Sequence, residues 1–345
     1  MPFDFLARVQ NLNPANLTIR EQTRLAENPN NLRWRDIFPR VPAPSVKLSE
    51  LSRVDARFAG GRREWNAQGR EIPEVLGARI DAEIVPINPT HHFDERALQH
   101  LRERASGFAE LFNAGIIRDV DAWATALANA ADIQIEADAF SAWFTNSVTV
   151  MDPKTGETVT VALGISTDRY VQASATLAAT TSAYVDFMGY MADAQAKLGS
   201  VGAARMRRSL LSEILADAPA FSGDKMSLAG LQERINREGF GDVRIVVDER
   251  TYHAFTDGGS AYAAAYYVPD DRIAFQPAGG VVGATHFAPV TRAYDYMSPQ
   301  AVRSVQDFTV FYSEKNDGKT LLVEAQANAL PLPIEQNVYV VTGIA

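Results

Sequence analysis

The sequence predicts an α+β protein that combines long helices with antiparallel strand pairs. Residues 120–144 repeat apolar side chains at helical spacing and contain neither glycine nor proline. Residues 147–163 form two short alternating segments around an Asp-Pro-x-x-Gly turn, whose residues favour chain reversal. Residues 307–313 and 320–329 form a second alternating pair around an Asn-Asp-Gly turn. These three patterns together indicate the mixed class.

The first 44 residues are predicted to form an extended arm. Asparagine and proline recur through it, and only residues 17–27 carry a short helical pattern. Such a segment cannot bury enough apolar surface to fold by itself. We therefore expect it to become ordered only against the body of the chain or against a neighbouring molecule.

Residues 45–85 are predicted to form a hairpin that projects from the body. Six arginines and seven acidic residues lie between positions 50 and 83, with few large apolar side chains among them. A two-stranded ribbon with so little to bury is not stable alone in water. Its balanced charges suit salt bridges to another subunit, and Trp65 would serve as an interface anchor. The alternative is a solvated surface hairpin or a disordered loop.

The region 86–165 is predicted to hold two helices and the first hairpin. Residues 94–114 have helical apolar spacing, and Gly115 is expected to end that helix. The pattern of residues 120–144 follows. At 1.5 Å per residue this longer helix would span about 37 Å, which makes it the dominant element of the chain.

The region 166–305 alternates between helical and strand patterns. Helices are expected at 181–198, 202–215 and 227–238, strands at 243–247 and 270–275, a further helix opening in 249–255, and loops at Gly279, Gly280 and Gly283. The last region, 306–345, adds the second strand pair. A Pro-Leu-Pro segment follows it, and residues 338–341 form a closing apolar strand.

Composition excludes several classes of protein. The chain has 33 basic and 42 acidic residues, a net charge of −9, and this argues against a sequence-independent nucleic-acid binder. With no cysteine there are no disulfides, thiolate metal sites or cysteine nucleophiles. Phosphate-loop, dinucleotide-binding, nucleophile-elbow and zinc-protease motifs do not occur. We therefore predict no catalytic, cofactor-binding or metal-binding residues, and no membrane-spanning segment.

Four stretches of this chain resemble one known family. They are Pro44-Ser45-Val46 with the segment 72–89, the long helix running into Val148-Thr149-Val150-Met151-Asp152-Pro153, the segment 243–252, and the ending 322–345 with its Leu-Pro-Leu-Pro step. In this order they resemble the major capsid proteins of tailed bacteriophages, which share the Hong Kong 97 capsid fold. The branch that they resemble is the lambda-type major capsid protein (phage major capsid protein E family). The resemblance covers residues 36–345.

The resemblance implies a division of the chain. Residues 1–44 would be the N-terminal arm, 45–85 the extended loop and 86–165 the peripheral domain with its spine helix (120–144) and hairpin (147–163). Residues 166–305 would be the axial domain, and 306–345 the return strands of the peripheral domain and the C-terminus. In this fold the segment 243–252 would be an axial strand followed by a helix, and residues 11–31 would lie along a neighbouring subunit.

The resemblance also implies a function. The chain would be a structural protein of the virion that self-assembles through hexamers and pentamers, in the bacterial host cytoplasm, into an icosahedral head. The head would enclose double-stranded DNA without sequence-specific binding. A separate scaffolding protein, a portal and a decoration protein would be partners, and no membrane would be involved. Subunit contacts through the extended loop would come from nine residues: Arg53, Arg57, Arg62, Arg63, Glu64, Trp65, Arg70, Glu71 and Glu74.

Two other functions remain open at this stage. An encapsulin-like compartment would form without scaffold or portal and would enclose an enzyme. A cytoplasmic α/β enzyme with an unrecognised site would instead have a ligand pocket lined by His253 or Asp248.

Overall fold

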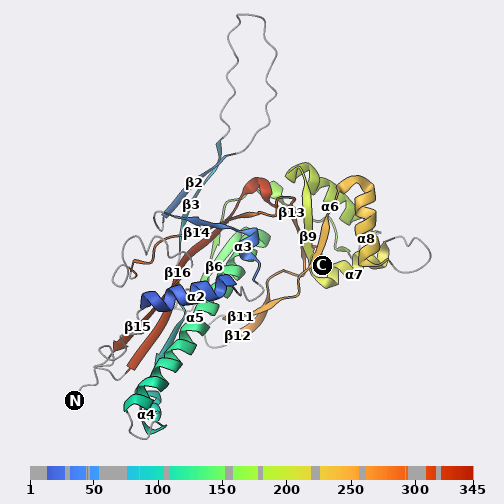
Figure 1. Ribbon diagram of the computed structural model, residues 1–345. Helices are drawn as coiled ribbons and strands as arrows, with labels where there is room; N and C mark the ends of the chain where they lie inside the picture. Colours follow the sequence, from blue (N-terminus) through green and yellow to red (C-terminus); the bar gives the residue numbers. More distant parts are fainter. Residues whose placement is uncertain are drawn as a thin grey trace, which may run out of the picture.

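The structure is a computed structural model of the whole chain. It describes the following residues: 14–27, 32–43, 45, 47–53, 76–84, 86–104, 109–151, 158–177, 182–218, 226–255, 262–291, 293, 308–315 and 320–344. One long helix, α5 (Ala109–Thr145), runs along the long strand β16 (Thr320–Pro333), and a second group of helices gathers around another sheet (Figure 1). The fold is α+β, as the sequence predicts.

The long helix is longer than its sequence pattern indicates. Residues 120–144 are helical as predicted, but α5 begins at Ala109 and has 37 residues, about 55 Å at 1.5 Å per residue. Of the expected helix 94–114, residues 95–104 are the helix α4 (Glu95–Arg104) and residues 109–114 belong to α5, while residues 105–108 lie outside the described residues. The expected end at Gly115 is wrong, because Gly115 lies inside α5. An interior glycine costs only about 1 kcal/mol. The packing of so long a helix offsets that cost.

The long strand β16 organises the first sheet. It pairs antiparallel with β15 (Thr309–Lys315), β14 (Gly283–Phe287) and β5 (Thr90–Phe93), and also with β4 (Pro86–Ile87). A short strand of the arm, β1 (Arg40–Pro42), adds to β14 in parallel. This sheet covers α5, and the cluster of apolar side chains between them is the larger core of the molecule.

β16 continues through Pro331 and Pro333, although the sequence pattern predicts that the strand ends at residue 329. Pro331 lies opposite Thr285 in the register, and the Thr285 N–H donates to the Pro39 carbonyl on the other side of β14. Thr285 and Pro331 therefore form a non-hydrogen-bonded pair, in which the residue on β16 donates nothing to β14. The missing N–H of proline costs no ladder bond here, so the strand continues.

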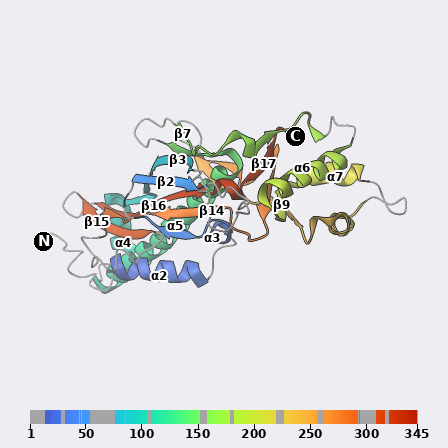
Figure 2. The same cartoon turned by 90° about the horizontal axis from the view of Figure 1, so that it is seen from above.

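The second sheet is buried on both faces. It has five strands, in the order β10 (Arg244–Val247), β9 (Val201–Met206), β13 (Arg272–Pro277), β17 (Tyr339–Thr342) and β8 (Tyr170–Gln172). Alternate residues of β17 enter different cores: Tyr339 and Val341 pack with the helices α6 (Ala183–Leu198), α7 (Arg208–Asp217) and α8 (Leu228–Ile235), whereas Val340 packs toward α5. In Figure 2, α6 and α7 lie beside β9 and β17.

Two helix predictions in this region fail in whole or in part. The predicted helix 202–215 is a strand in its first part and the helix α7 from Arg208 onward, as expected. Residues 201–206 form β9, which is buried on both faces, so the apolar and polar alternation that marks a half-exposed strand is missing. Residues 251–255 form β11 (Thr251–Phe255), paired with β12 (Tyr262–Tyr266), so the expected axial helix is absent. In β11 the exposed Thr251 and His253 alternate with less exposed neighbours, the two-residue period of a strand.

Several expectations for the body agree with the structure. The confirmed elements are the helices α6 and α8, the strands β10, β13, β15 and β17, and the hairpin β6 (Ser147–Met151) with β7 (Thr158–Ala162). The helix expected in the arm is α2 (Pro14–Glu27). Within the described part of the chain, no helix is both long and apolar enough to cross a membrane.

The arm helix packs on its own chain. In α2, Leu17 and Leu25 are buried against α5 and β15. The Val310 N–H donates to Thr18 Oγ1 at 2.9 Å, and Gln22 Nε2 donates to the Phe308 carbonyl at 2.9 Å. Residues 14–27 therefore find the apolar surface that they need on their own body, and the contact of residues 11–31 with a neighbour stays a prediction. The rest of that segment lies outside the described residues.

The projecting hairpin is confirmed at its base. β2 (Lys47–Arg53) pairs antiparallel with β3 (Leu76–Glu83), and the register shifts between Leu51 and Arg53. Both strands leave the body together in Figure 1. Residues 54–75, which connect them, lie outside the described residues.

Gly283 opens β14, although the sequence predicts a loop there. A Cβ at this position would overlap the Leu332 carbonyl oxygen and the Phe38 ring. Glycine therefore lets β14 approach β16 and the arm at the same point.

We expect Gly283→Ala to lower the free energy of unfolding by about 1–3 kcal/mol, the usual cost of forcing extra atoms into a packed core. Gly279→Ala is the matched control, because a Cβ there meets no atom within 4 Å. Chemical denaturation of both variants checks this. Equal stabilities would contradict the close approach of β14 to β16.

Candidate functional site

The predicted contact residues of the extended loop lie at the edge of what the structure describes. Arg53 is the last residue of β2. The other eight, Arg57 to Glu74, lie within 54–75 and so outside the described residues. Their grouping at a subunit contact stays a prediction. What the structure does provide is the base of the ribbon and the body to which it is attached.

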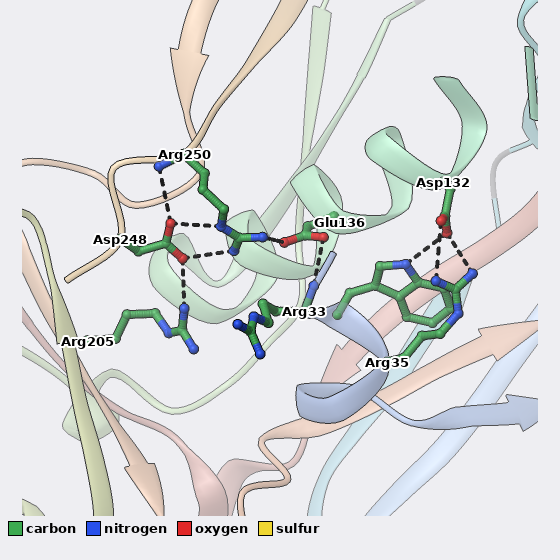
Figure 3. A network of polar contacts seen from close by, with 8 residues as sticks. Arg33, Arg35, Asp132, Glu136, Arg205, Asp248 and Arg250 are labelled. Carbon is green, nitrogen blue, oxygen red and sulfur yellow. Dashed lines mark hydrogen bonds and ion pairs between the residues drawn. The ribbon is translucent and has the colours of Figure 1, made fainter. Parts of the chain in front are cut away.

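A connected group of charged residues lies where the arm, the long helix and the second sheet meet. We call it the polar junction, and Figure 3 shows it. Its members are Arg33, Trp34 and Arg35 from the arm, Asp132 and Glu136 from α5, Arg205 from β9, and Asp248 and Arg250 from the segment between β10 and β11.

Glu136 is the centre of the polar junction. Its side chain is fully buried, and it binds two different parts of the chain. The Arg33 backbone N–H donates to Oε2 at 3.0 Å, and Arg250 Nη1 lies 2.7 Å from Oε1. Burial raises the pKa of Glu136, although Arg250 and the Arg33 N–H act in the opposite direction. One carboxylate thus ties the arm and the second sheet to the long helix.

Asp248 holds two arginines beside the second sheet. Arg205 Nη1 donates to its Oδ2 at 2.7 Å, and Arg250 donates through Nε to Oδ1 at 2.9 Å and through Nη2 to Oδ2 at 2.8 Å. Burial alone would raise the pKa of this carboxyl group, but the hydrogen bonds and charge of Arg250 and the charge of Arg205 hold it below its usual range. Asp248 is therefore a charged structural residue.

Asp132 binds the arm through side chains. Trp34 Nε1 donates to Oδ1 at 2.9 Å, and Arg35 donates to both carboxylate oxygens, at 2.9 and 3.2 Å. Trp34 and Asp132 are both fully buried. The short helix α3 (Trp34–Ile37) is thus fixed to α5 one turn before Glu136, since residues four apart share a helix face.

Aromatic rings enclose the arginines of the polar junction. The Arg205 and Arg250 guanidinium carbons lie 5.4 and 5.5 Å from the ring centre of Phe140. Arg250 also lies 5.2 Å from the Tyr267 ring centre. Cation–π contacts of this kind are stronger when they are desolvated. They replace part of the hydration that the buried Arg205 and the half-buried Arg250 lose.

The polar junction fixes orientation more than it adds stability. Asp132, Glu136 and Asp248 are balanced by Arg35, Arg205 and Arg250, so the group carries little net charge. Buried ion pairs gain little over well-packed apolar residues, but removing one partner leaves a buried charge uncompensated. The geometry therefore favours one arrangement of arm, long helix and second sheet over alternatives.

The residues proposed for an enzyme pocket do not form one. Asp248 is occupied by two arginines, and His253 is exposed on β11. The residues that the structure describes also contain no group of three or more side chains suited to holding a metal ion.

Sequence reasoning did not single out Asp132 or Glu136. The available signal was two acidic residues four positions apart on an otherwise alanine-rich, apolar stretch of helix. Charged residues are almost never fully buried unless they are paired. The pattern could therefore have indicated a buried ion-pair site, although the partners are 97 to 114 positions away along the chain.

Asp138 is a third acidic residue of α5 in an apolar setting. Gln134 Nε2 donates to its Oδ1 at 2.8 Å, and none of the described arginines and lysines forms an ion pair with it. Burial raises its pKa to about 7. The carboxyl group is therefore protonated in the folded chain at pH values where it is ionised in the unfolded chain.

We expect Arg250→Met to lower the free energy of unfolding by about 3 kcal/mol, because Glu136 then loses its cation. Arg237→Met is the matched control: Arg237 forms an exposed ion pair with Glu233, and its loss should cost less than about 1 kcal/mol. Urea denaturation at neutral pH checks both. A cost for Arg250→Met no larger than that of the control would contradict the role of the polar junction.

We expect Asp138→Asn to change the pH dependence of stability. The folded pKa of about 7 lies above the unfolded value, so Asp138 makes the folded state less stable as pH rises from about 4 to 7, by at most about 1.4 kcal/mol per pH unit. The variant lacks this loss, and its advantage over the parent chain should grow across that range and then level off. Denaturation at several pH values measures it, with the exposed Asp242→Asn as control. Parallel profiles for parent and Asp138→Asn would contradict it.

Comparison with known proteins gives structural matches alone. No family model and no curated protein matches the sequence. A crystal structure of a candidate capsid protein from a prophage of E. coli CFT073 is 13% identical, with 90% of this chain and 92% of that chain covered and a TM-score of 0.53. The capsid of Myoviridae phage XM1 is 14% identical, with 89% of each chain covered and a TM-score of 0.45. The capsid of a native GTA particle is 14% identical, with 90% of each chain covered and a TM-score of 0.45.

The prophage match extends over nearly the whole of both chains, so the likeness concerns the complete architecture. At 13% identity it establishes the fold, and the lambda-type branch stays a prediction. The chain has the Hong Kong 97-type capsid fold.

Proposed function

We propose that this chain is the major capsid protein of a tailed double-stranded DNA phage. The observation that carries the proposal is the fold, shared over 90% of the chain with the prophage protein described as a capsid protein. The role is structural and not catalytic, and it would place the protein in the virion shell. The lambda-type branch, the arm, extended loop, peripheral and axial divisions and the host cytoplasm as the place of assembly are parts of the same proposal.

The ribbon of β2 and β3 supports assembly through subunit contacts. A two-stranded ribbon is at best marginally stable alone, and this one leaves the body (Figure 1). A neighbouring subunit would supply the surface that it lacks. We assign the contacts to Arg53, Arg57, Arg62, Arg63, Glu64, Trp65, Arg70, Glu71 and Glu74, within hexamers and pentamers of this chain. A scaffolding protein, a portal and a decoration protein would be further partners.

The charge of the chain supports a shell around DNA. With a net charge of −9, the protein as a whole is repelled by the phosphate backbone, so packaged DNA would slide past the inner surface during filling. Such an inner surface must bind DNA weakly and without sequence preference.

We expect the double variant Arg62→Glu and Arg63→Glu to remain a soluble, folded subunit that no longer forms shells, because two charges are reversed at the subunit contact and its net charge falls by four units. The control is Arg118→Glu with Arg244→Glu, which makes the same charge change at two exposed positions of the body. Negative-stain electron microscopy at low and high protein concentration, with circular dichroism for folding, checks both.

Shells of normal yield from the Arg62 and Arg63 variant would refute the assigned contact. If the parent chain forms neither shells nor capsomer rings, alone or when co-expressed with a scaffolding protein from the same phage, the capsid function itself fails.

A further inference from the structure

The hairpin of β6 and β7 has an unusual composition for an exposed ribbon. Its strands are Ser-Val-Thr-Val-Met and Thr-Val-Thr-Val-Ala, with no charged residue, proline or glycine in either. By contrast, the strands of the β2–β3 ribbon carry six charged residues: Lys47, Glu50, Arg53, Arg79, Asp81 and Glu83. The strands of one ribbon are therefore rich in charged residues, and the strands of the other contain none.

The base of the β6–β7 ribbon is fixed to the body. Val148 is buried with Ala142 and Leu163. Ser141 Oγ, on α5, donates to the Ser147 carbonyl at 2.9 Å. Asn146, with a positive φ of 56°, ends α5, and its side chain bonds the backbone of the segment that follows β7. The ribbon is thus held in a set direction relative to the long helix.

The outer strand of the ribbon is open. Among the described residues, β7 pairs with β6 alone. Val159 is 58% exposed, and Thr160 and Ala162 are also exposed. Natural proteins usually protect such an edge with lysine, proline or a bulge, because a bare edge strand recruits another strand. β7 has β-branched side chains and no charged or proline residue, so nothing in its sequence opposes strand addition.

We propose that β7 pairs antiparallel with β7 of a second copy of this chain, about a two-fold axis near Thr160. The inference rests on the proposed function, since a shell supplies the second copy. The sequence of β7 is suited to itself: in this register Val159 faces Val161 of the copy, and Thr160 faces its own counterpart. An isologous contact brings identical groups together, and an uncharged strand does so without repulsion. A charged partner strand would find no complement on β7.

Disulfide trapping tests this contact directly. The chain has no cysteine, so Thr160→Cys introduces the sole thiol. Directly opposed residues of paired antiparallel strands have Cβ atoms about 4.5–5.5 Å apart, close to the range of a disulfide. We expect mild oxidation of assembled protein to give covalent dimers on a non-reducing gel, which a reductant returns to monomers.

Val185→Cys is the matched control, because Val185 is 61% exposed on α6, as accessible as Val159. It should give no dimers above background. Monomeric Thr160→Cys protein from the same oxidised shells, or an equal dimer fraction in the control, would overturn the proposal.

A second pair of variants tests whether assembly uses the contact. We expect Val159→Lys to reduce the yield of shells at least tenfold and Val185→Lys to leave it unchanged. Both variants add one charge at an exposed valine, but only Val159→Lys adds it to the open edge strand β7. Equal yields would overturn the proposal and leave the capsid function standing. If the parent chain forms no shells, the capsid function fails separately. Oxidation of concentrated Thr160→Cys subunits then decides the pairing, since dimers support it and monomers refute it.

Discussion

The burial of Glu136 on the long helix is the constraint on which the arrangement of this molecule depends. A carboxylate without water must be compensated, and here the backbone of the arm and the guanidinium of Arg250 compensate it at different oxygens. Asp132 and Asp248 are also buried carboxylates, and they accept hydrogen bonds from Trp34 and Arg205 respectively. The arm, the long helix and the second sheet therefore cannot shift independently without leaving a charge unpaired.

The second sheet shows how one layer serves two cores. Along β17, side chains on one face contact α6, α7 and α8, and those on the other face contact the α5 side. This sheet therefore contacts the long helix directly, and the polar junction lies beside it. Apolar packing sets the distance between the two parts, and the ion pairs select their orientation.

The ribbons of the chain show how charge separates two kinds of surface. The sequence of β2–β3 is rich in both signs of charge, and that of β6–β7 has none. Charged ribbons select partners by complementarity, whereas an uncharged edge pairs through its backbone and depends on the correct neighbour being present. The two ribbons therefore differ in the physical interaction through which each could bind a partner.

The amino-acid sequence by itself determined the α+β class, the core of the long helix, three hairpins and the overall order of elements, because these depend on local periodicity and turn residues. Tertiary structure decided the rest. β9 lacks a strand's alternation because both of its faces are buried, and Gly115 lies inside a helix because packing offsets its cost. The arm helix α2 packs against the body of its own chain. The polar junction was hidden because the partners of Asp132 and Glu136 are about one hundred residues away, and a buried charge is recognised by what surrounds it and not by its neighbours in the chain.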